Sequence, residues 1–228
     1  MPAAWTLGCG RRRCSRYPVC IRSCDATCAG AGNRNGRSLP SPLHHLGLRK
    51  AALIGSSLGG RTAIDVALDH SELVSSLVFV GAGLAGFEFS LDYQQMMVSI
   101  LGPLALGNTT SYVAAFLDSA LGARSEESQP LVAQMLVDNQ RLFSGDAAFL
   151  VPSEPPASSR LPEIHVPTLV MTGAEDHPDI LEIARILATG IAGAERQTVP
   201  GAAHMVSLDA PDEFNRIVLR FLATHPVA

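Results

Sequence analysis

Cysteine is missing from most of this 228-residue chain. All of the cysteines lie in the first 28 residues, at positions 9, 14, 20, 24 and 28. Their spacing lacks the closely paired ligands of a zinc site, so we expect no metal. An odd number of cysteines, with no apolar signal-peptide core after the arginines, argues against a secreted disulfide framework. We therefore expect a cytoplasmic protein.

Long apolar runs and aromatic side chains are also scarce. No run of 18 apolar residues occurs, so we expect no membrane span. Phe, Trp and Tyr make up only 5% of the chain. Net positive charge is confined to one end: residues 1–40 hold seven arginines and one aspartate, whereas the rest holds 10 basic and 20 acidic residues. The acidic body opposes nucleic-acid binding. Residues 1–40 are interpreted as a disordered, basic Cys/Arg-rich arm.

The most informative segment is Gly55–Gly60, Gly-Ser-Ser-Leu-Gly-Gly, which follows the apolar run 51–54. It fits G-x-S-x-G, the pattern of a sharp strand-to-helix turn that lifts a serine hydroxyl above a sheet. Ser57 is the candidate nucleophile, and a helix is expected over 58–69. Glycine is expected at 55 and 59 because the helix crosses close to the strand. The alternative is an ordinary Gly/Ser turn.

An acid and a histidine follow in matching positions. The buried-strand pattern at 166–173 leads into Asp176, and the strand pattern at 196–199 leads into His204. Carboxyl ends of parallel strands meet at one sheet edge, so Ser57, Asp176 and His204 are expected to converge there. This chain order is that of an α/β-hydrolase triad.

The acid and the histidine also have simpler interpretations. Asp176 could cap the helix that begins near Pro178, and Glu175 and Asp179 are alternative acids. His204 could be a polar loop residue.

From about Leu46 to Phe221 the chain resembles α/β-hydrolases of the 3-oxoadipate enol-lactonase and non-haem haloperoxidase-like group. The stretches that carry the resemblance are 45–60, 166–170 and 200–205. The resemblance implies an α/β fold, with a mostly parallel sheet flanked by helices, and a cofactor-free serine hydrolase. Its substrate would be a small apolar ester, lactone or related carbonyl compound. Thioester or C–C hydrolysis and perhydrolysis stay open.

The N-terminal part departs from this group. Relatives place several strands and an oxyanion-hole loop, usually with His-Gly, before the serine, but no His-Gly dipeptide occurs here and early strands are not recognisable. The Leu58 N–H would supply one oxyanion donor. The alternative function is therefore a catalytically impaired or non-catalytic α/β-hydrolase fragment. Oligomeric state is left open.

The remaining segments are divided between core and cap. Residues 41–83 and 161–228 are predicted to form the core, and 84–160 a helical cap. Apolar cap residues would either face a substrate or form the interior of the cap: Met96, Met97, Ile100, Leu101, Phe116, Met135 and Phe149. Gly81, Gly83 and Gly86 match G-x-G-x-x-G, which leaves a dinucleotide-binding oxidoreductase as a remote alternative. That alternative lacks an acid about 20 residues later.

Overall fold

The computed structural model describes residues 49–122, 128–139 and 154–227, and these contain a parallel sheet. Its strands are β1 (Ala51–Ser56), β2 (Val74–Val80), β3 (Thr168–Gly173) and β4 (Glu195–Val199), in the spatial order β1-β2-β3-β4. The register pairs Ile54 with Val78 and Val80 with Met171. Strands β2 and β3 are buried almost throughout, as expected where helices cover both faces of a parallel sheet.

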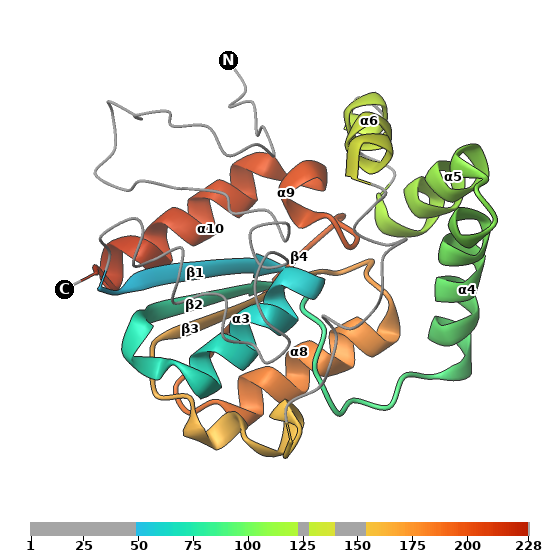
Figure 1. The fold of residues 1–228 in the computed structure, drawn as a ribbon. Coiled ribbons are helices and arrows are strands. Elements are labelled where there is room, and N and C mark those ends of the chain that lie inside the picture. Colours follow the sequence, from blue (N-terminus) through green and yellow to red (C-terminus); the bar gives the residue numbers. More distant parts are fainter. Residues whose placement is uncertain (1–48, 123–127, 140–153, 228) are drawn as a thin grey trace.

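Helices cover the two faces of this sheet (Figure 1). Helices α3 (Leu58–Asp69) and α8 (Pro178–Gly190) lie on one face, and α10 (Pro211–Thr224) lies on the other, preceded by the single-turn helix α9 (Val206–Asp209). The apolar stripes of α3 and α8 share one core with side chains of β2, and α10 shares a second core with β3. The result is a three-layer α/β arrangement.

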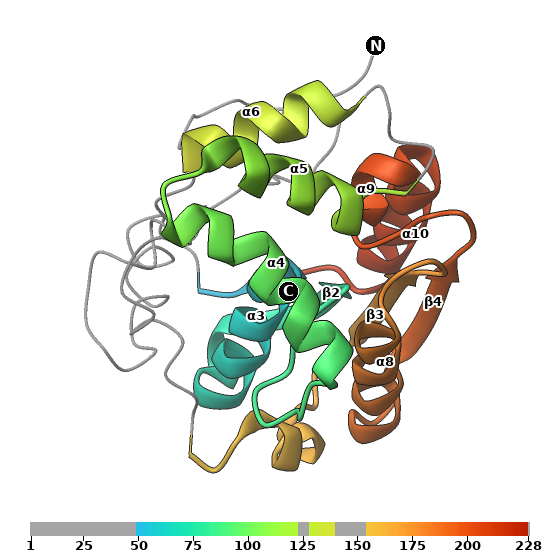
Figure 2. The same ribbon diagram turned by 90° about the vertical axis from the view of Figure 1, so that its right-hand side faces the viewer.

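Three described helices form a separate layer at the carboxyl ends of the strands (Figure 2). These are α4 (Leu91–Ala105), α5 (Thr109–Ala120) and α6 (Gln129–Asn139). They share a small apolar core built on Ile100, Tyr112 and Leu136. The chain returns to the sheet through the short 3₁₀ turns η4 (Ala157–Ser159) and η5 (Leu161–Glu163); a further turn, η1 (Ser71–Leu73), joins α3 to β2.

Several details refine the sequence predictions. The helix expected over 58–69 has the predicted bounds, whereas the strand pattern at 166–173 forms β3 only from Thr168 onward. The strand pattern at 196–199 forms β4, which begins one residue earlier, at Glu195. Residues 1–40, the predicted basic arm, lie outside the described part of the chain, as does Phe149.

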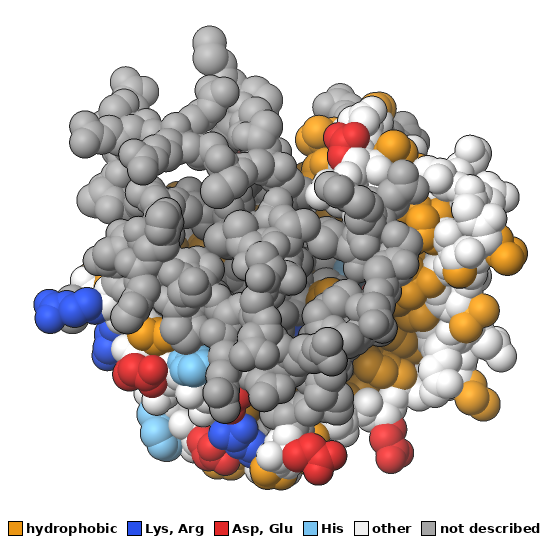
Figure 3. All heavy atoms as spheres, in the orientation of Figure 1, with side chains coloured by type: hydrophobic (Ala, Val, Ile, Leu, Met, Phe, Trp, Pro, Cys, Tyr) orange, Lys and Arg blue, Asp and Glu red, His pale blue; other side chains and the backbone are white. Residues whose placement is uncertain are grey.

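The apolar cap residues that were singled out mostly form the interior of the cap. Ile100 is buried there, and Met96, Met97, Leu101 and Phe116 pack against the same cluster. Figure 3 shows further hydrophobic side chains on the outer surface of this layer; α4 exposes Leu91 and Val98, and Leu106, directly after it, is exposed as well. The interior interpretation therefore accounts for most of these residues.

Candidate active site

Ser57 is the single residue between the end of β1 and the start of α3. Its φ of 50° and ψ of −115° place it in a region that non-glycine residues rarely adopt, and no other described non-glycine residue has a positive φ. Such a conformation costs about 1–3 kcal/mol and persists only when surrounding contacts enforce it. Here the Ser57 N–H donates to the Val80 carbonyl at 2.9 Å, and the Gly83 N–H donates to the Ser57 carbonyl at 3.1 Å. Strand β2 and the segment after it therefore hold the turn.

Gly55 and Gly60 allow α3 to cross close to β1, whereas the sequence predicted Gly55 and Gly59. A Cβ at Gly55 would lie 2.7 Å from the Gly60 Cα. A Cβ at Gly60 would lie 3.0 Å from the Ala82 Cα and 3.1 Å from the Gly55 carbonyl oxygen. A Cβ at Gly59 meets nothing within 4 Å among the described atoms. The expectation for position 59 was wrong because Gly60, one residue further, faces the sheet.

Asp176 and His204 meet at the same edge of the sheet. His204 Nδ1 lies 3.0 Å from Asp176 Oδ2 and 3.1 Å from Oδ1. The aspartate side chain is 2% exposed and the histidine side chain 19% exposed. Because Nδ1 faces a carboxylate, it carries the proton in the neutral ring, and Nε2 is left with a free lone pair that can accept a proton. A buried carboxylate thus orients a histidine that solvent still reaches.

The competing interpretations of Asp176 do not fit the geometry. The N-cap of α8 is His177, whose Nδ1 accepts from the Asp179 N–H at 3.2 Å. Asp179 Oδ2 itself accepts from the Ser90 N–H at 2.8 Å, which ties the segment before α4 to α8. Glu175 is exposed. Of the acids considered, only Asp176 has a described hydrogen bond to His204.

Gly81 brings the Asp176–His204 pair next to the serine turn. It follows β2 at a φ of 53°, and a Cβ on it would lie 3.0 Å from His204 Nδ1 and 3.1 Å from Asp176 Oδ2. Its neighbours in sequence include Val80, which accepts from the Ser57 N–H. The structure therefore brings the three predicted residues to one edge of the sheet. Position 81 was noticed only as part of a glycine motif, and its role against the histidine was missed.

The dinucleotide alternative loses its structural basis. A pyrophosphate site of that kind needs a helix directly after the glycines. After Gly86 the chain remains irregular until α4 begins at Leu91. Gly86 also packs tightly, since a Cβ there would lie 2.7 Å from Pro156 Cβ.

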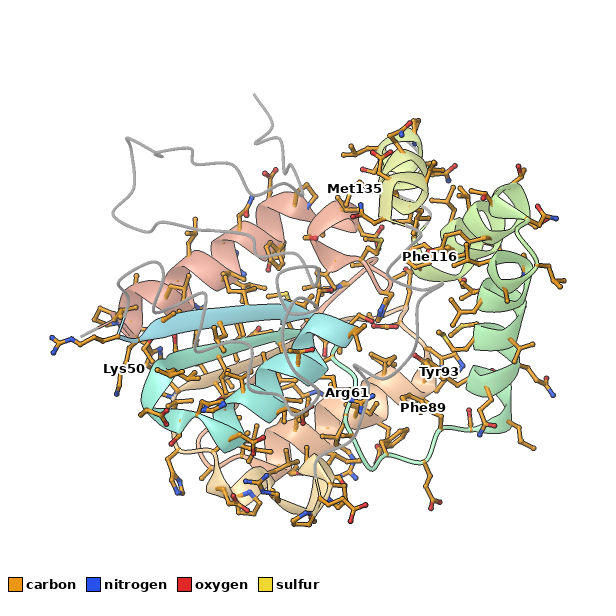
Figure 4. All side chains as sticks on the ribbon, in the orientation of Figure 1. Lys50, Arg61, Phe89, Tyr93, Phe116 and Met135 are labelled. Carbon is orange, nitrogen blue, oxygen red and sulfur yellow. The ribbon has the colours of Figure 1, made fainter. Side chains whose placement is uncertain are left out.

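An aromatic group borders the site and has no counterpart in the sequence predictions. Phe89 and Tyr93 stack with ring centroids 4.3 Å apart, and Tyr93 meets the His177 ring edge-on at 5.0 Å. Figure 4 shows both aromatic side chains between the core and the cap helices. Burial, together with the carboxylates of Asp176 and Asp179, raises the pKa of the Tyr93 phenol above its ordinary value.

Leu58, the predicted oxyanion donor, is the first residue of α3. The first N–H groups of a helix have no carbonyl partner within it, so they are available to a developing negative charge. In the part of the chain that the structure describes, no group of three His, Cys, Asp or Glu side chains is suited to hold a metal ion. No helix within those same ranges is long and apolar enough to cross a bilayer.

A family model of the "Alpha/beta hydrolase family" matches residues 6–217. The chain belongs to the alpha/beta hydrolase family. The matched region begins well before Leu46, where the resemblance starts in the sequence, and it includes the serine turn, Asp176 and His204.

Known proteins agree with this hydrolase assignment. A 2-hydroxy-6-oxononadienedioate/2-hydroxy-6-oxononatrienedioate hydrolase of a Pseudomonas species is 26% identical over 91% of this chain and 72% of its own length. An esterase of Thermogutta terrifontis (19% identical, TM-score 0.71) covers 84% of this chain and 72% of its own. The enol-lactonase of Burkholderia xenovorans (21% identical, TM-score 0.68) covers 82% and 71%. The two structures show that the hydrolase fold is shared.

Proposed function

We propose that this alpha/beta hydrolase cleaves small ester or lactone substrates with Ser57 as nucleophile, His204 as base and Asp176 as orienting acid. The proposal rests above all on the 3.0 Å contact between His204 Nδ1 and Asp176, formed beside the strained serine turn. Acyl-transfer sites combine a nucleophile on a strained backbone with a partly exposed histidine whose ring is oriented by a buried carboxylate.

The proposed reaction follows from the positions of the protons. His204 Nε2 takes the Ser57 hydroxyl proton as the oxygen attacks the substrate carbonyl, and Asp176 stabilises the imidazolium that forms. The imidazolium then gives the proton to the leaving oxygen, which departs as an alcohol. Water, activated by the same histidine, attacks the acyl-enzyme in the second step and releases the acid.

The Leu58 N–H would stabilise the negative charge on the tetrahedral intermediate. It stands at the N-terminus of α3, where the helix dipole adds favourable potential. Removing one oxyanion donor typically costs about 10²–10³ in rate, so a site with a single donor would be slow. A non-catalytic relative of the family is accordingly the alternative that the experiment must address.

The described cap helices favour a neutral substrate. Residues 84–122 and 128–139 contain no lysine or arginine, whereas Arg124 and Arg141 belong to the predicted cap but lie outside the described residues. The curated relatives are named for dicarboxylates. A carboxylate that leaves water for the apolar surface of α4, α5 and α6 would need a cationic partner, which these helices do not supply.

The proposal is tested by hydrolysis of p-nitrophenyl butyrate and of a simple lactone by the purified chain. Ser57→Ala should lower kcat/KM by at least about 10³-fold, because the covalent step is lost. Ser56→Ala is the matched control, since it removes the same hydroxyl from the preceding residue, and it should stay within a few-fold of the parent.

Two outcomes contradict the proposal. Equal loss in both serine variants would show that the hydroxyl of Ser57 has no special role. A folded parent chain without activity on either substrate would support the non-catalytic alternative.

A further inference from the structure

Asp209 lies at the end of α9, five residues after His204, and is buried with 6% of its surface exposed. Its carboxylate accepts a hydrogen bond from the Ala203 N–H at 2.7 Å. Ala203 directly precedes His204, so this bond fixes the backbone from which the imidazole projects. A charged acceptor makes such a bond shorter and stronger than a neutral one does.

The same carboxylate also holds the end of the cap helix α5. The Gly122 N–H lies 3.1 Å from Asp209 Oδ1 and 3.3 Å from Oδ2. On the other side of His204, the Met205 N–H donates to the Ala120 carbonyl at 3.1 Å. The backbone on both sides of the histidine is thus tied to the end of α5, directly at Ala120 and through Asp209 at Gly122, two residues after the helix.

Side-chain packing reinforces this connection. Met205 and Leu208 pack against the apolar core of the cap rather than against the core of the sheet. Gly122 permits the close approach, because a Cβ there would lie 3.3 Å from Asp209 Oδ2 and 3.4 Å from the Ala203 nitrogen. The loop that carries His204 is therefore partly built on the cap.

We infer that Asp209 is a positioning residue that joins the His204 loop to the cap, so that the histidine is aligned only when α5 is seated. This inference rests on the proposed function of His204. Asp209 Oδ2 accepts from the Ala203 N–H at 2.7 Å, and Oδ1 is the nearer acceptor for the Gly122 N–H, at 3.1 Å against 3.3 Å for Oδ2. An asparagine supplies a single, neutral acceptor oxygen, so at least one of these contacts is lost and the others lose the strength that a charged acceptor gives.

The rate of Ser57 modification by a small fluorophosphonate tests the catalytic consequence. Asp209→Asn should lower the maximal labelling rate constant by about 10–100-fold with little change in the concentration for half-saturation, since a misplacement of about 1 Å costs up to about 10²-fold. Asp212→Asn, the same change at an exposed acid in the first turn of α10, should label at the parent rate.

Loss of stability alone must be separated from loss of alignment. Ile191→Val trims a buried side chain in the core shared by α3 and α8, which does not include the residues around His204, and should lower the melting temperature without changing the labelling rate. Gly122→Ala provides a second test should Asp209→Asn not fold. It keeps the carboxylate and crowds it, and should slow labelling by about 3–10-fold.

Amide hydrogen exchange tests the link independently of catalysis. In Asp209→Asn the amides of Ala203 or Gly122 should exchange faster than in the parent, while amides in β3 stay protected. Parent-like labelling, or unchanged protection of both amides, would overturn the inference. If the parent chain itself is not labelled, the proposed function fails, and the exchange data still decide whether Asp209 holds the two segments.

Discussion

Replacing Gly60 with alanine tests how closely helix α3 must approach the sheet. The added methyl would lie 3.0 Å from the Ala82 Cα and 3.1 Å from the Gly55 carbonyl oxygen, and it would overlap the Ala82 side chain. These neighbours are backbone or backbone-attached atoms that cannot rotate away, so the helix itself must shift. Because Ser57 directly precedes α3, the shift would also move the proposed nucleophile.

The expected cost follows from packing and helix propensity. Overpacking a tight core costs about 1–3 kcal/mol, of which alanine's higher helix propensity returns about 0.5–1 kcal/mol. Gly59→Ala is the matched control, since it makes the same change one residue earlier, where a methyl meets nothing within 4 Å of the described atoms. It should stabilise the protein by about 0.5–1 kcal/mol.

Thermal and urea unfolding measure this difference. For a domain of this size about 1 kcal/mol shifts the melting temperature by about 2–4 °C, so Gly60→Ala should melt clearly below the parent and Gly59→Ala slightly above it. Equal melting temperatures for the two variants, or a larger loss at position 59, would refute the account of the helix crossing.

Three further predictions concern other parts of the site and the core. Gly81→Ala places a methyl against His204 in a positive-φ conformation, so ester hydrolysis should fall by about 10²-fold or more while the fold persists by circular dichroism. Burial raises the pKa of Asp65, so its ionisation destabilises the native state as pH rises above the ordinary value of 3.8. Asp65→Asn should therefore gain stability relative to the parent, by up to about 1 kcal/mol, between pH 4.5 and 7.5 in urea titrations. Arg160→Ala loses the 3.1 Å ion pair to Asp69 on α3 and should cost about 1 kcal/mol in the same assay, less in high salt.

The sequence predicted most of the elements that build the site. Continuous apolar runs, as at 168–173, predicted the buried strands, because a sheet covered on both faces leaves no room for alternation. The order of Ser57, Asp176 and His204 along the chain predicted that they meet at one edge, since the strands are parallel.

The rest depended on contacts between segments that are distant in sequence. The choice of Gly60 over Gly59 depends on which side of α3 faces Ala82, and Ala82 comes from the distant segment after β2. Nothing local distinguishes Asp209 from an ordinary helix-end acid; its role appears only when Gly122, 87 residues earlier, is placed beside it. The close approach of Gly81 to His204 likewise becomes visible only once the histidine has been placed in the fold.

The most direct test of the proposed triad is fluorophosphonate labelling of the purified chain, mapped by mass spectrometry. His204→Ala removes the proposed base, and His165→Ala removes an exposed histidine that precedes β3. The account predicts a label on Ser57 in the parent and in His165→Ala, and at least about 10³-fold slower labelling in His204→Ala. A label on another residue, or labelling of Ser57 that does not depend on His204, would contradict it.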